Sequence, residues 1–155
     1  MAKLKEADFY YGSIISMLLN NKICPILVEG GTDRQVYEFT TNEGDFKLFL
    51  KYRSEAIPTK MDGYQSWQFS FSADDIAELR RFISDDKHLS VGLVCGMSTL
   101  SNSEYAVLHK EEIGQLLDAG KTSLTISRKS GEKAFRISVG GGRENALQVK
   151  SNRKY

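Results

Sequence analysis

The sequence predicts a single α+β domain, in which three helices pack on a mixed, mostly antiparallel sheet and a β-meander lies at the C-terminal end. Apolar residues recur with the period of a helix in three segments, residues 3–20, 72–85 and 109–119. Apolar and polar residues alternate with the period of a strand most clearly at residues 34–53 and 124–150. Because these strand segments are joined by short turns, antiparallel hairpins are expected.

The N-terminal part predicts one helix and one strand. Along residues 3–20 an apolar stripe recurs every three or four residues and is formed by Leu4, Ala7, Tyr11, Ile14 and Leu18. Residues 23–28 are nearly all apolar, which predicts a short buried strand. Pro25 places this strand near an edge of the sheet, because proline cannot donate to a strand ladder. Residues 29–33 predict a loop.

Residues 34–53 predict the hairpin on which the functional expectations depend. The chain reverses at Asn42-Glu43-Gly44, where both Asn and Gly accept a positive φ. Strand alternation directs one set of side chains into the core: Tyr37, Phe39, Leu48, Leu50 and Tyr52. The opposite face is expected to remain in contact with water, and it carries Glu38, Thr40, Asp45, Lys47, Lys51 and Arg53. Phe49 is the apolar exception on that face.

A third strand, a helix and a central strand are expected next. Residues 67–71 alternate aromatic rings with polar residues, and we expect these rings to pack beside the apolar face of the hairpin. Ser72 and Asp75 match a capping box that opens the helix at residues 72–85. The nearly continuous apolar run at residues 89–95 predicts a central strand.

The last third predicts a strand at residues 104–108, a helix at 109–119 that Gly120 ends, and a three-stranded meander. The side chains expected to face inward are Leu124, Ile126, Phe135, Ile137, Val139, Leu147 and Val149. Those expected to face outward include Thr125, Ser127, Lys129, Arg136, Gln148 and Lys150. Ser130-Gly131 predicts the first turn, and Gly140-Gly141-Gly142 predicts a looser second connection.

No linker divides residues 1–155, so one domain is predicted. Within this domain, residues 1–97 form an αβββαβ-like core in the expected order of elements. Residues 104–150 then form a strand, a helix and the meander, as a C-terminal extension.

Charged residues are distributed unevenly, although the net charge is only +1. After Gly120 there are nine basic and two acidic residues, whereas the first 120 residues hold 12 basic and 18 acidic ones. This split predicts a small binding protein with a basic C-terminal sheet surface for nucleic acid or another anionic partner. The expected contacts are Arg128, Lys129, Arg136 and Lys150, helped by hydroxyl groups of neighbouring residues.

Three other interpretations of this charge stay open. The basic part packs against the acidic part, or the cations form an ordinary solvated face, or the protein is an adaptor or inhibitor that binds an acidic protein surface.

Composition predicts a cytoplasmic protein that does not enter a membrane. No apolar run reaches the roughly 20 residues that a membrane helix needs, and the N-terminal residues are too acidic and polar for a secretory signal. Cys24 and Cys95 lie in apolar, strand-like surroundings, which predicts two buried thiols in a reducing compartment. His88 and His109 lack metal-ligand spacing, so no cofactor is expected outside the alternative that follows.

Asp33, eleven intervening residues and then Asp45-Phe46-Lys47 resemble the motif of the PD-(D/E)xK nucleases. The order of elements in residues 1–95 is also similar to the αβββαβ core of that superfamily. The resemblance implies a Mg²⁺-dependent nuclease in which Asp33 and Asp45 hold the cation. Lys47, with Lys51 beside it, would orient the attacking water or stabilise developing charge. Thr32 stands where the family has proline, and the plainer interpretation is a turn aspartate followed by exposed strand lysines.

A second resemblance is to small bacterial proteins that carry no assigned function. It lies in residues 49–52, 67–71, 93–96 and 124–128, and it implies a compact α+β domain. It points to Lys51 and Trp67 and not to the Asp45-Phe46-Lys47 segment. The sequence leaves open whether the protein catalyses a reaction and what its oligomeric state is.

Overall fold

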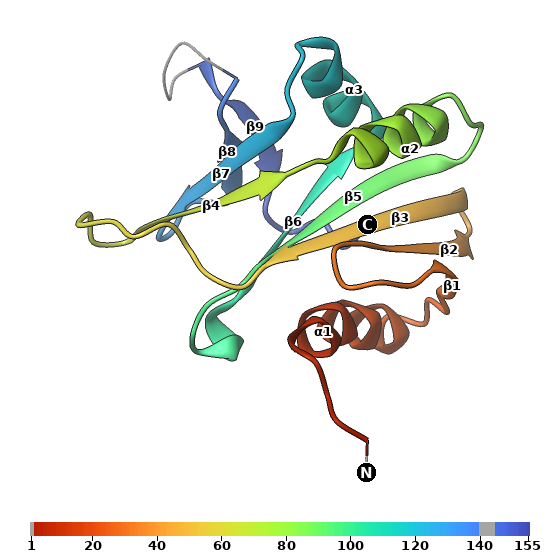
Figure 1. Cartoon of the computed structure of the whole chain (residues 1–155), viewed down its shortest axis with the longest axis horizontal. Coiled ribbons are helices and arrows are strands. Elements are labelled where there is room, and N and C mark those ends of the chain that lie inside the picture. Colours follow the sequence, from red (N-terminus) through yellow and green to blue (C-terminus); the bar gives the residue numbers. More distant parts are fainter. Residues whose placement is uncertain (1, 140–144) are drawn as a thin grey trace.

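A computed structural model describes residues 2–139 and 145–155 of the chain (Figure 1). The described residues form one α+β domain of three α-helices and nine strands in two sheets, which confirms the predicted fold class. The elements in chain order are α1 (Glu6–Asn20), β1 (Ile26–Glu29), β2 (Gln35–Thr41), β3 (Gly44–Arg53), β4 (Tyr64–Ser70), α2 (Ala73–Ile83), β5 (His88–Cys95), the 3₁₀-helix η1 (Leu100–Asn102), β6 (Glu104–His109), α3 (Lys110–Asp118), β7 (Ser123–Lys129), β8 (Ala134–Ile137) and β9 (Leu147–Lys150).

The first sheet has the strand order β1-β2-β3-β5-β6. All neighbours in it are antiparallel except β3 and β5, which run parallel with Phe46 opposite His88. β2 and β3 form the predicted hairpin, and Gly44 has a φ of 124° at its turn, a value that side chains rarely tolerate. β5 lies between two strands and is buried from Leu89 to Cys95, as its continuous apolar sequence predicts.

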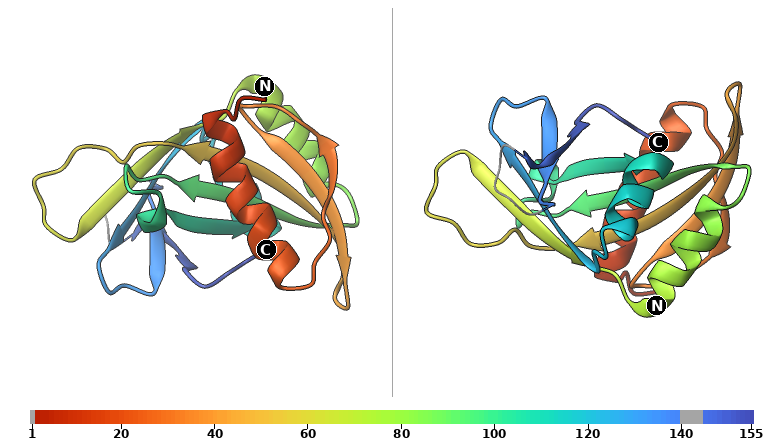
Figure 2. Two further views of the ribbon diagram at one scale, coloured as in Figure 1. Left: turned by 90° about the horizontal axis from the view of Figure 1, so that it is seen from below. Right: turned by 90° about the horizontal axis from the view of Figure 1, so that it is seen from above.

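Helix α1 covers one face of the first sheet (Figure 2). Its buried side chains include Tyr11, Ile14 and Leu18, and they pack against the apolar face of the hairpin, which includes Leu48 and Leu50. The predicted inward set of the hairpin is therefore confirmed, since Tyr37, Phe39, Leu48 and Leu50 are buried in this core and Tyr52 packs against it.

A second and larger core lies on the opposite face of the first sheet. It is closed by α2, by α3 and by the second sheet, and it contains Phe49 from β3 together with Trp67 and Phe69 from β4. The expectation that the rings of residues 67–71 pack beside Tyr37 and Leu50 is therefore wrong. The sequence shows that β4 has an aromatic face, but not which of the two faces of the first sheet this strand meets.

The second sheet has the order β4-β7-β8-β9, and all its strands are antiparallel. It contains the predicted meander and adds β4 to it. Gly131, with a φ of 88°, makes the first turn, whereas residues 140–142 of the second connection lie outside the described residues. The expected division into a core at residues 1–97 and an extension at residues 104–150 does not match the two sheets. Strand β4 of the expected core pairs with β7 of the extension, and β6 of the extension pairs with β5 of the core.

Strand β1 differs from its prediction. It lies at the edge of the first sheet, as Pro25 indicates, but Ile26, Leu27 and Val28 are 70%, 54% and 54% exposed. Cys24 is exposed as well, so only Cys95 is the buried thiol that was expected, and burial raises its pKa. Among the described residues, no helix combines the length and the apolar character needed to cross a membrane.

Candidate nucleic-acid interface and a charged cluster

The second sheet has one buried face and one polar face. The residues at the outward positions of its strands are Tyr64, Ser66, Gln68, Ser70, Ser123, Thr125, Ser127, Lys129, Ala134, Arg136, Gln148 and Lys150. We call this set the outer face. It carries hydroxyl groups, amides and cations, and none of its members is acidic. Its arrangement follows from strand alternation, since the inward positions hold the apolar core residues.

Three lysines gather at one end of the outer face, near the turn between β7 and β8. Lys129 lies opposite Tyr64, and Lys150 lies opposite Ala134. Lys133 is beside them, because its carbonyl oxygen accepts a 2.9 Å hydrogen bond from the backbone N–H of Ser151. The three lysines are exposed, and among residues 2–139 and 145–155 no carboxylate forms an ion pair with them.

Arg136 also lies on the outer face, but its charge is partly compensated. Its Nε lies 3.2 Å from the carboxylate of Glu132, which belongs to the turn between β7 and β8. The lysine end of the outer face is therefore more strongly cationic than its centre.

Arg128 does not belong to the outer face, which corrects its predicted role. Its side chain has the parity of Leu124 and Ile126, so it points to the other side of the sheet and reaches Glu104 of β6. It also donates to the carbonyl oxygen of Glu132 over 2.8 Å. The hydrogen bond to Glu104 raises the pKa of the Arg128 guanidinium and ties the second sheet to the first.

Part of the charge asymmetry is therefore compensated within the molecule. Besides Arg128, Arg153 forms a bidentate pair with Glu112 of α3, with nitrogen to oxygen distances of 2.5 and 3.2 Å. These contacts support the interpretation in which the basic part packs on the acidic part, but they leave the lysines of the outer face available to a partner.

The structure does not bring Asp33 and Asp45 together. Asp45 is opposite Thr40 near the hairpin turn, whereas Asp33 precedes β2 at the other end, where Gln35 is opposite Leu50. The strand between Gln35 and Thr40 alone spans about 16 Å, and a shared cation needs oxygen ligands within about 2–2.6 Å. The predicted Mg²⁺ site at these two residues therefore does not form. Across the described part of the chain, no group of three His, Cys, Asp or Glu side chains is placed to hold a metal.

Lys47 and Lys51 point to the same side of β3, as predicted, but they are not in contact with water as expected. They are only 8% and 9% exposed, because α2 lies across this face of the sheet. The ammonium group of Lys47 lies 3.4 Å from the carboxylate of Glu38 and 4.2 Å from the centre of the Phe82 ring. Together with the Asp85 carboxylate at 4.0 Å, these contacts are those of a structural lysine whose charge is compensated within the protein.

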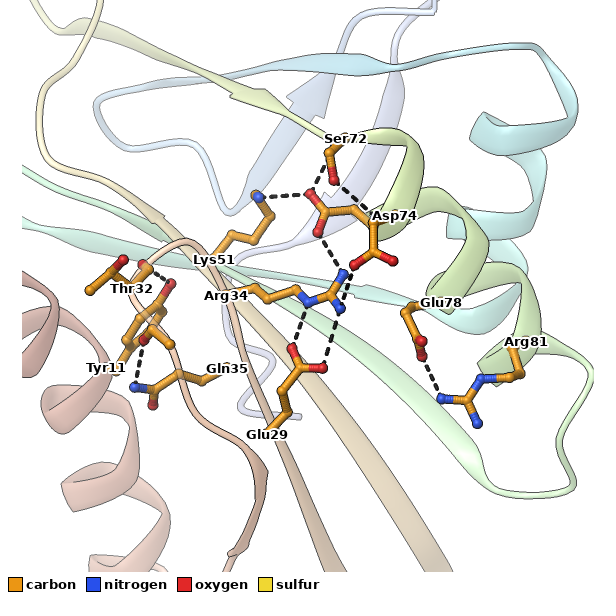
Figure 3. Close-up of polar contacts among 12 residues, drawn as sticks. Tyr11, Glu29, Thr32, Arg34, Gln35, Lys51, Ser72, Asp74, Glu78 and Arg81 are labelled. Atoms are coloured by element: carbon orange, nitrogen blue, oxygen red, sulfur yellow. Dashed lines mark hydrogen bonds and ion pairs between the residues drawn. The ribbon is translucent and has the colours of Figure 1, made fainter.

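Lys51 belongs to a charged cluster centred on Arg34 (Figure 3). Arg34 Nη1 lies 2.8 Å from Asp75, and Lys51 Nζ lies 3.0 Å from the other oxygen of that carboxylate. The remaining guanidinium nitrogens bind Glu29, at 2.6 and 3.2 Å, and Asp74, at 2.9 Å. We call these five residues the Arg34 cluster. It joins the loop after β1, strand β3 and the first turn of α2.

Asp75 is the most buried carboxylate of the cluster and also caps the helix. Its side chain accepts a 3.0 Å hydrogen bond from the backbone N–H of Ser72, and the Ser72 hydroxyl accepts one from the backbone N–H of Asp75. The capping box is thus confirmed. Sequence reasoning missed the two cations that reach Asp75, because Arg34 is 41 residues away and no local pattern marks the pair.

A cavity of about 740 Å³ lies beside the cluster, and Asp33, Lys51 and Arg53 are among its lining residues. Arg34 and Lys51, the two cations of the Arg34 cluster, are already paired with carboxylates. The Arg34 cluster therefore links structural elements and does not form an open site for an anion. Asp33 and Lys51 both line this cavity, but Asp45, the second carboxylate of the nuclease alternative, is not among its lining residues.

The stability that the Asp75 charge contributes should depend on pH. Burial raises the pKa of this carboxyl group, but the hydrogen bonds from Lys51, Ser72 and Arg34 lower it further, so its pKa lies below the ordinary value. Because its pKa is lower in the folded state, the ionised carboxylate stabilises the fold at every pH above about 3.9, the pKa of an aspartate in the unfolded chain. This stabilisation is lost as the pH falls through the pKa of the folded state. The difference in the free energy of urea unfolding between the wild type and Asp75→Asn should shrink from about pH 6 to about pH 3. A difference that stays constant over this range would contradict the assignment.

Comparisons with known proteins do not place the chain in a family. No family model, curated protein or solved structure matches it.

Proposed function

We propose that the protein binds nucleic acid through the outer face of the second sheet. The observation that supports this proposal is the composition of that face. Its described strand positions combine cations, hydroxyl groups and amides without one carboxylate, although the whole chain has almost equal numbers of basic and acidic residues. Phosphate groups are recognised by this combination, with ammonium groups supplying charge and hydroxyl groups supplying hydrogen bonds.

The same face favours the backbone of a duplex over single-stranded bases. Proteins that bind single strands stack successive bases on aromatic rings. Tyr64 is the one aromatic residue at the described outward positions, and Phe135 points into the core. Binding is therefore expected to be independent of base sequence and to depend strongly on salt.

Reversing the charge of Lys129 and Lys150 together, in Lys129→Glu/Lys150→Glu, should weaken binding to a short fluorescent DNA or RNA duplex by at least about tenfold at about 50 mM salt. The slope of log affinity against log salt concentration should also become shallower by about two. Each phosphate contact releases roughly one counterion on binding, and this variant loses two such contacts. Fluorescence anisotropy across a salt series measures both quantities.

The matched control is Lys3→Glu/Lys5→Glu, which changes the net charge equally at the N-terminal end of α1, far from the outer face. This control should retain most of the affinity. The proposal fails if the wild type does not bind duplex at low salt, or if both double variants lose the same affinity. If polyglutamate displaces the duplex at equal charge concentration, an acidic protein surface becomes the better partner.

A further inference from the structure

The cavity beside the Arg34 cluster contains two charged side chains that the cluster does not use. Its volume of about 740 Å³ lies within the range of small-molecule sites, roughly 300–1,000 Å³. Asp33 and Arg53 line it, and both are exposed. In the part of the chain that the structure describes, neither of them forms an ion pair. The cavity therefore offers one unpaired carboxylate and one unpaired guanidinium group.

The two chain segments that carry Asp33 and Arg53 are joined at one carboxylate, that of Asp75 (Figure 3). Arg34 follows Asp33 directly, and its Nη1 lies 2.8 Å from Asp75. Lys51 lies two residues before Arg53, on the same face of β3, and its Nζ lies 3.0 Å from the other oxygen of Asp75. The two unpaired charges therefore flank a cluster whose own charges are compensated, and one small molecule can reach both.

The side of the cavity near Asp33 attracts positive charge. The carbonyl oxygen of Thr32 accepts a 2.9 Å hydrogen bond from the Tyr11 hydroxyl, which holds the backbone just before Asp33. Glu6 also lines the cavity, and it accepts a hydrogen bond from the Tyr52 hydroxyl. Burial raises the pKa of Tyr52, and the contact with Glu6 and the charge of Asp33 raise it further. Two carboxylates thus act on this side, which suits an ammonium group.

Binding of an anionic group in the cavity depends on Arg53. Three cations line the cavity, but Arg34 and Lys51 already pair with carboxylates of the Arg34 cluster. Neutral hydrogen-bonding groups belong to the same lining, since the Gln68 amide and the Ser70 hydroxyl reach it from β4 and are exposed. A ligand carboxylate can pair with the guanidinium group of Arg53, while the rest of the ligand meets amide and hydroxyl groups.

We propose that this cavity binds a free amino acid, with its ammonium group at Asp33 and its carboxylate at Arg53. A purely anionic ligand would leave Asp33 without a partner, and a purely cationic ligand would leave Arg53 without one. A zwitterion satisfies both charges at once. The amide and hydroxyl groups of the lining favour an amino acid with a polar side chain. This inference does not rest on nucleic-acid binding, because the lysines of the outer face are not among the lining residues.

Differential scanning calorimetry of the full chain with each of the standard amino acids, at about 10 mM or at saturation, tests the proposal. At least one polar amino acid should raise the Tm by about 3 °C or more, because a ligand that binds only the folded state stabilises it. Isothermal titration calorimetry then compares that amino acid with its amide, which lacks the carboxylate, and its N-acetyl derivative, which lacks the ammonium group. Both derivatives should bind at least about tenfold more weakly. The proposal is wrong if no amino acid raises the Tm, or if either derivative binds as tightly as the parent.

Variants of the two charged residues locate the ligand. Asp33→Asn and Arg53→Gln should each weaken binding at least about tenfold, and Arg53→Lys, which keeps the charge, should lose less. The matched controls are Asp86→Asn and Lys60→Gln, at exposed residues that do not line this cavity, and they should bind like the wild type. Without ligand, the Tm of Asp33→Asn and Arg53→Gln should stay within about 2 °C of the wild type, because neither side chain has an ion-pair partner to lose. Equal affinity of these two variants and the controls would place the ligand elsewhere and overturn the proposal.

Discussion

Replacing Asp75 by Ala is expected to lower the free energy of unfolding by about 3–5 kcal/mol, as is typical when one partner of a buried ion pair is removed. Asp75 is 5% exposed and is the carboxylate that Lys51 and Arg34 share. Without it, the buried ammonium group of Lys51 loses its ion-pair partner, and α2 loses the side chain that binds the backbone N–H of Ser72. Urea unfolding followed by far-UV circular dichroism measures the change.

The adjacent carboxylate provides the control for this result. Asp74 also pairs with Arg34, but its side chain is 77% exposed, and exposed pairs contribute at most about 1 kcal/mol. Asp74→Ala should therefore change the free energy of unfolding by less than about 1 kcal/mol. If the two variants lose equal stability, burial does not determine how much each carboxylate of the Arg34 cluster contributes to the free energy of unfolding.

Trp67→Ala is expected to cost a similar amount, about 3–5 kcal/mol, for a different reason. Trp67 is the only tryptophan of the chain, and it is fully buried in the core between the two sheets. Its indole Nε1–H donates a 2.9 Å hydrogen bond to the carbonyl oxygen of Gly96, just after β5. Removing the ring leaves a cavity where β4 meets the first sheet, and it also removes this donor.

Two further variants separate packing from hydrogen bonding at this position. Trp67→Phe retains an aromatic ring but loses the indole donor, so a smaller loss of about 1–3 kcal/mol is expected. Phe9→Ala, at a side chain that is 50% exposed on α1, should change the stability by less than about 1 kcal/mol. Because the tryptophan itself is replaced, circular dichroism and not fluorescence must follow the unfolding. A loss below about 1 kcal/mol for Trp67→Ala would show that the two sheets do not depend on this ring.

The nuclease alternative shows how a motif can match in sequence and not in space. Asp33 and Asp45 have the expected spacing along the chain, but the hairpin between them is extended and places them at its two ends. The number of residues between the two aspartates does not show that the chain reverses at Asn42-Glu43-Gly44. This reversal places Asp45 next to Thr40 and far from Asp33. In the second sheet, strand alternation correctly predicted that Lys129, Arg136 and Lys150 point outward, whereas Arg128, which was also expected to contact a partner, has inward parity.

Local patterns in the sequence determined which side of each element is apolar and where several elements begin. The faces of β3, the cap at Ser72 and the alternation of the meander all follow from side-chain geometry over a few residues. Tertiary structure decided which elements lie side by side. It placed β4 in the second sheet, brought Arg34 to Asp75, and left β1 exposed at its edge of the first sheet, although its apolar composition predicts a buried strand. The reason is physical: periodicity is set by the backbone within one element, whereas burial and ion pairing depend on contacts between residues that are distant in sequence.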